Sequence, residues 1–119
     1  MKFDDLITPA DVEREMIDLT RRLENAPGVI KEYHTKVRVA RNDYKKAYAL
    51  AFSTATGTQM DRKIQAELST AAAEQAVDDA EIEYRFVVDT MDALKSKLRA
   101  LQSVSSLMKA SMFGNHGGV

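Results

Sequence analysis

Few residues of this chain could do chemistry, and their spacing does not assemble them into a catalytic site. The chain has 119 residues, no Cys, and two His at positions 34 and 116, which excludes thiolate catalysis, disulfides and cysteine zinc sites. Glu32 and His34 are two residues apart and therefore face different sides of a helix, and no Glu-x-x-His pair of the di-iron bundle type occurs. Gly57 lacks the neighbouring glycines of a phosphate-binding loop. We therefore expect a non-enzymatic protein with no catalytic residue, metal site or cofactor.

One group of basic residues has a spacing that suits nucleic acid. His34, Arg38, Arg41 and Lys45 recur at intervals of four, three and four, which places them on one stripe of a helix. Residues 31–46 hold six bases against two acids, and such a stripe can follow a phosphate backbone. The net charge of -1 argues against the basic excess of an obligate nucleic-acid binder. The alternative is internal pairing with residues 74–92, which hold seven acids against one base.

Three helices must position these residues. Thr8 and Pro9 predict the start of a helix over about 9–25, because the threonine oxygen can accept from a free N–H and proline suits the first helical position. Pro27 and Gly28 predict a kink or short hinge. A second helix is expected over about 28–53 and one long third helix over about 59–112, in which no Pro or Gly occurs. Between them lies a turn that contains Gly57.

A heptad seam runs along both of the longer helices. Apolar and small residues alternate at spacings of three and four, which is the spacing of a coiled coil: Ile30, Tyr33, Val37, Ala40, Tyr44, Ala47 and Ala51, then Ala73, Val77, Ala80, Tyr84, Val87, Met91, Leu94, Leu98, Leu101, Ser105, Met108 and Met112. We therefore predict an all-α, antiparallel helical hairpin, with the first two helices packed along the third in one domain over residues 1–113 and a flexible tail over 114–119.

Charge patterning supports this antiparallel arrangement. Folding back at Gly57 brings the basic residues 31–46 beside the acidic residues 74–92. The same fold brings the first helix, with seven acids and three bases over residues 4–24, beside Lys95, Lys97, Arg99 and Lys109. Opposite charges on facing helices favour this orientation over the alternatives.

The helices carry more apolar residues than one hairpin buries. Ile64 and Leu68, for example, lie off the seam. The predicted partner or oligomer surface consists of Ile82, Phe86, Val104, Leu107, Met108, Met112 and Phe113. We expect self-association into a homo-oligomeric bundle or binding to another protein. No apolar run reaches the length of a membrane span or of a secretory leader, so we expect a cytoplasmic protein without membrane contact.

The closing helix reads MDALKSKLRALQS over residues 91–103. Together with the Thr-Pro helix start and the Thr/Gly turn, it resembles the small helical-hairpin, coiled-coil accessory proteins of tailed bacteriophages and prophages, over most of the chain. Some of these lie beside recombination and replication genes. The resemblance carries over no functional residue, but it implies an adaptor that acts through protein contacts in DNA recombination or replication. The alternatives are nucleic-acid binding through the basic stripe and a role in virion assembly as a scaffold.

Overall fold

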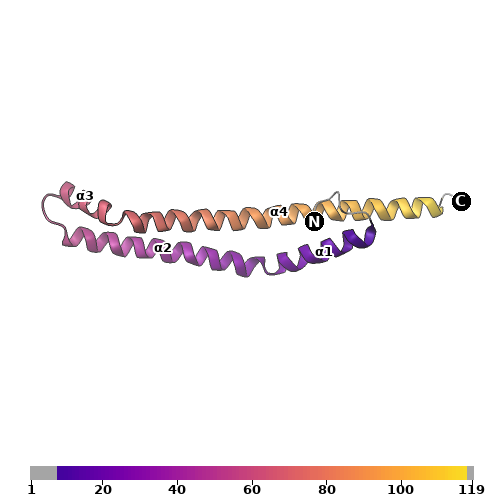
Figure 1. Cartoon of the computed structure of the whole chain (residues 1–119), viewed down its shortest axis with the longest axis horizontal. Helices are drawn as coiled ribbons and strands as arrows, with labels where there is room; N and C mark the ends of the chain where they lie inside the picture. Colours follow the sequence, from indigo (N-terminus) through magenta and orange to yellow (C-terminus); the bar gives the residue numbers. More distant parts are fainter. Residues whose placement is uncertain (1–7, 118–119) are drawn as a thin grey trace. The chain divides into compact units, whose positions relative to one another are not determined.

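The protein is all-α over the residues that its structure describes. The computed structural model describes residues 8–117, with side chains described as far as Met112. It contains the helices α1 (Pro9–Glu24), α2 (Ala26–Thr54), α3 (Gln59–Ser69) and α4 (Ala71–Gly117) (Figure 1). These elements confirm the predicted helical-hairpin fold class; the oligomeric bundle stays a prediction.

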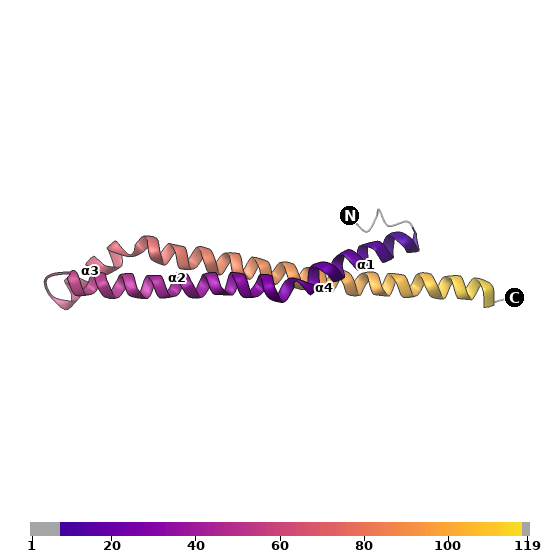
Figure 2. The same cartoon turned by 90° about the horizontal axis from the view of Figure 1, so that it is seen from below.

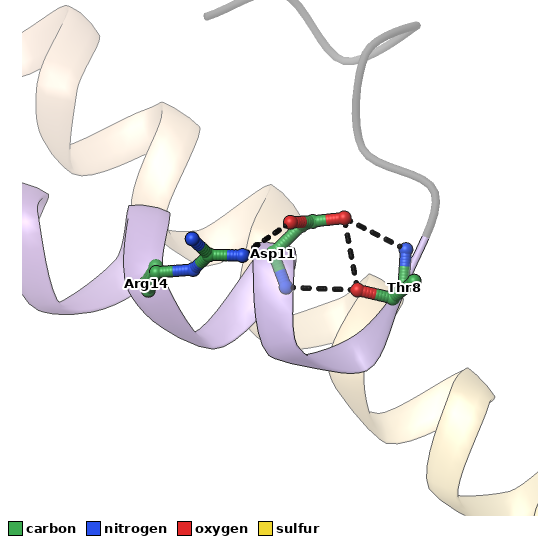
Figure 3. Close-up of polar contacts among 3 residues, drawn as sticks. All are labelled: Thr8, Asp11 and Arg14. Atoms are coloured by element: carbon green, nitrogen blue, oxygen red, sulfur yellow. Dashed lines mark hydrogen bonds and ion pairs between the residues drawn. The ribbon is translucent and has the colours of Figure 1, made fainter.

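Helix α1 begins at the predicted residue, and a reciprocal set of hydrogen bonds explains why. The backbone N–H of Asp11 donates to Oγ1 of Thr8 over 3.2 Å, and the backbone N–H of Thr8 donates to the Asp11 carboxylate over 3.2 Å (Figure 3). Arg14 pairs with the same carboxylate at 2.6 Å. This capping box satisfies N–H groups that have no partner within the helix.

A single residue, Asn25, joins α1 and α2. Asn25 caps α1, and Ala26 already belongs to α2. Pro27 therefore lies in the first turn of α2, where its missing N–H would have no helical partner anyway. The predicted break falls at this place, although Pro27 lies inside the second helix instead of before it.

The turn between α2 and α3 also falls where the sequence predicts it. Gly57 has a φ of 105°, a left-handed conformation that favours glycine. Thr58 then begins α3 with a second capping box, in which its side chain accepts from the N–H of Asp61. The side chain of Gln65 donates to the carbonyl of Thr56 over 2.8 Å and so ties α3 to the turn.

The predicted single helix over 59–112 is wrong in one respect, because it is interrupted at Thr70. This residue caps α3 with φ -108° and ψ 10°, and α4 begins at Ala71. The hydroxyls of Ser69 and Thr70 both donate to the carbonyl of Ala66, over 3.2 and 2.7 Å. Adjacent hydroxyl side chains that bond to the backbone in this way favour a helix end, whereas the prediction considered only Pro and Gly as breakers. Figure 2 shows the chain changing direction between α3 and α4.

At its other end, α4 continues past the predicted limit near Met112. It includes Gly114 and ends at Gly117, so the first residues of the predicted 114–119 tail are helical. Glycine lowers helix stability by only about 1 kcal/mol relative to alanine. Residues 118–119 lie outside the described residues.

Internal contacts divide the chain into two units. We call Gly28–Val88 the hairpin unit, and the described residues up to Pro27 together with those from Asp89 to Gly117 the terminal unit. The predicted single domain over residues 1–113 stays a prediction.

In the hairpin unit, α2 and the first part of α4 are antiparallel neighbours (Figures 1 and 2). Arg41 contacts Glu81, while the earlier His34 contacts the later Tyr84, so the two helices run in opposite directions. All of the predicted seam positions of this unit are buried or half-buried. Val37, at 2% exposure, is the most buried seam position on α2. The predicted heptad packing is therefore confirmed in this unit.

In the terminal unit, α1 packs on the second part of α4. Val12, Leu19 and Leu101 are fully buried together, and the partly buried side chains around them are Met16, Leu94, Leu98, Val104 and Met108. Lys97 pairs with Glu15 at 2.8 Å beside this cluster. The first helix thus packs along the predicted seam of α4, as expected from the sequence, with opposite charges beside the contact.

Candidate interaction surfaces

The basic stripe of α2 lies partly against α4. The His34 ring is 5.4 Å from the Tyr84 ring, and the Arg41 guanidinium donates to the Glu81 carboxylate over 2.6 Å. Arg38 and Lys45 are exposed. The structure therefore places these four residues on one side of α2, and two of them, His34 and Arg41, contact α4.

Acidic side chains of α4 lie near this part of α2. Glu81 also lies 4.0 Å from Arg85, so one carboxylate stands between two guanidinium groups. Burial raises the pKa of the Tyr44 phenol, and the nearby carboxylate of Glu74 adds to the shift. These neighbours reduce the positive potential that a phosphate backbone would meet along α2.

The predicted partner surface divides into exposed and packed side chains. Ile82 and Phe86, one turn apart on α4, are 62% and 71% exposed in the hairpin unit. In the terminal unit, Leu107 is 71% and Met112 is 56% exposed. Val104 and Met108 instead pack against the buried core of that unit. The side chain of Phe113 lies outside the described residues.

Helix α3 carries an exposed apolar stripe that lies outside the predicted partner surface. Met60, Ile64 and Leu68 recur every four residues and are 64%, 48% and 75% exposed. The opposite side of the same helix packs inward, since Ala66 is fully buried and Thr70 is 4% exposed. The four-residue spacing is visible in the sequence. It indicates an exposed surface only because α3 is a separate helix whose small residues are the buried ones.

Two hollows flank α3. One, of about 270 Å³, is lined by Tyr48, Phe52, Gln59, Met60 and Lys63. Its aromatic wall continues a row along α2, because the Tyr48 ring lies 6.2 Å from Tyr44 and 6.4 Å from Phe52. The other, of about 430 Å³, is lined mainly by small side chains: Ala47, Leu50, Ala51, Thr54, Ala55, Gln65, Ser69 and Thr70.

The described residues contain no cluster of three or more His, Asp or Glu side chains placed to hold a metal ion. None of the helices, within the same residues, combines the length and the apolar character needed to cross a bilayer.

Comparisons with protein families, with curated proteins and with solved structures found no match to this chain.

Proposed function

We propose that this chain is a non-enzymatic helical-hairpin protein that works by binding other proteins, beginning with copies of itself. The observation that carries the proposal is the pair Ile82 and Phe86, exposed by 62% and 71% on a helix whose seam is already packed. Burying a large apolar side chain at an interface is worth about 1.5–3 kcal/mol. Adjacent apolar side chains that the hairpin itself leaves uncovered therefore favour a protein contact.

Light scattering over a range of concentrations tests this function. The monomer mass is 13.3 kDa, and we expect a mass at least twice this value that falls on dilution. A monomer at every concentration would refute self-association.

A photo-crosslinking amino acid at Phe86 tests the surface directly in the native host. A product at twice the chain mass marks a second copy, and a product of another mass marks a different protein. The same label at the exposed Thr35 of α2 is the control, because Thr35 is two positions from the seam residues Tyr33 and Val37 and so faces away from α4. Equal, background crosslinking at both positions would contradict the proposal for this surface.

The phage-type accessory role in DNA recombination or replication is part of the same proposal, supported by the sequence resemblance alone. Nucleic-acid binding through the α2 stripe is the alternative, and the exposed Arg38 and Lys45 are the side chains best placed for it. A salt-dependent gel shift that is lost on charge reversal of both residues would favour this alternative. No binding at low salt would remove it. Large homogeneous multimers would instead favour a virion scaffold.

A further inference from the structure

We infer that α3 is the pairing surface between two copies of this chain, joined antiparallel about a two-fold axis near Ile64. This inference rests on the proposed self-association and assigns it to α3, which leaves Ile82 and Phe86 for a different protein. The first argument is the reversed polarity of α3. An isolated surface helix normally turns its apolar side inward, yet α3 buries Ala66 and exposes Met60, Ile64 and Leu68.

The second argument is that this stripe is complementary to itself. In an antiparallel pair centred on Ile64, Met60 of each copy lies opposite Leu68 of the other, and the two Ile64 side chains meet. An interface of this kind uses the same patch on both copies, as two-fold symmetry requires. Leu68 is the most exposed of the three at 75%, so pairing would remove the largest fraction of its surface from water.

The third argument is charge. Lys63 and Glu67 lie on the same flank of the stripe, with Nζ and Oε1 4.0 Å apart within one copy. Reversing the direction of a second α3 brings Lys63 of each copy close to Glu67 of the other. The pairing therefore forms two equivalent opposite-charge contacts, which outnumber the single approach of one Lys63 to the other at the two-fold axis.

The fourth argument is the hollow beside Met60. Tyr48 and Phe52 form its aromatic wall, and Lys63 also lines it. Since Leu68 of the second copy lies opposite Met60, its side chain arrives at this hollow. A volume of about 270 Å³ is ample for one leucine, given that an apolar cavity of about 150 Å³ holds benzene.

Charge reversal tests the geometry. Lys63→Glu and Glu67→Lys each convert both intermolecular pairs into repulsions, and we expect each to weaken dimerisation about tenfold. An equimolar mixture of the two variants should recover the dimer, because every pair is then opposite in sign. The double variant should also recover it. If either substitution acted only by disturbing the fold, mixing the two variants would not restore the dimer. Circular dichroism checks that each variant stays helical.

Leu68→Asp tests the apolar stripe, with Val39→Asp as the matched control. Val39 is 53% exposed on α2 and belongs neither to α3 nor to the predicted partner surface. We expect Leu68→Asp to give a monomer at concentrations where Val39→Asp and the unmodified chain are dimers. A dimer that is indifferent to Leu68→Asp and to both charge reversals would overturn the α3 surface and leave the proposed function standing. An unmodified chain that stays monomeric would overturn both.

Discussion

Truncating Leu101 gives the sharpest test of how α1 and α4 hold together. Its side chain is fully buried with Val12 and Leu19, and Leu101→Ala removes three carbon atoms from that cluster. At about 0.8 kcal/mol per buried CH₂, the lost transfer free energy is about 2.4 kcal/mol. The cavity left behind adds to this loss, so we expect the free energy of unfolding to fall by about 3 kcal/mol.

Leu107→Ala is the matched control. It makes the same chemical change on the same helix, six positions further along, but the side chain is 71% exposed. Its effect should stay within about 0.5 kcal/mol, as for other surface substitutions.

Urea and thermal unfolding followed by far-ultraviolet circular dichroism measure both variants. Small domains have a total stability of about 5–15 kcal/mol, so Leu101→Ala should lower the midpoint temperature by more than about 10 °C. Equal shifts for the two leucines would refute the packing of α1 on α4, because burial alone distinguishes them.

Two further predictions concern the turn and the terminal unit. Gly57→Ala should destabilise the protein by more than about 1 kcal/mol, because φ is +105° and the new Cβ would lie 2.7 Å from the Asp61 carboxylate; Gly28→Ala, with nothing within 4 Å of its Cβ, should instead stabilise α2 by up to about 1 kcal/mol. The urea midpoint should fall in Gly57→Ala and rise in Gly28→Ala, and shifts in the same direction would contradict this pair of predictions. The hydrogen bond from Lys97 holds the pKa of Glu15 below its ordinary value of 4.5, so this carboxylate stabilises the fold above the ordinary pKa and loses that contribution as pH falls through the lowered one. Unfolding of Glu15→Gln from pH 7 to pH 2 should show a deficit at neutral pH that closes in acid, and a deficit independent of pH would exclude the ion pair as its cause.

Local signals in the sequence predicted most of the fold. Thr8 and Thr58 mark helix starts because a side-chain oxygen three residues before a free N–H can cap it wherever the helix lies. The heptad spacing identifies the seam for a similar reason, since residues three and four apart share a helix face in any helix. The break at Thr70 was missed because it depends on two hydroxyls bonding to one carbonyl, a weaker signal than proline or glycine.

The sequence predicts the helical segments other than the break at Thr70, the turn, the seam and the opposite charges through which Arg41 meets Glu81 and Glu15 meets Lys97. Which of the remaining apolar side chains are covered follows from the tertiary structure alone. Val104 and Leu107 are three residues apart on one helix, yet the first packs against the core and the second is exposed. Periodicity places a residue on a face of its helix, but burial depends on where the neighbouring helix lies and ends. For the same reason, the exposed stripe of α3 emerged only when the structure showed its small residues facing inward.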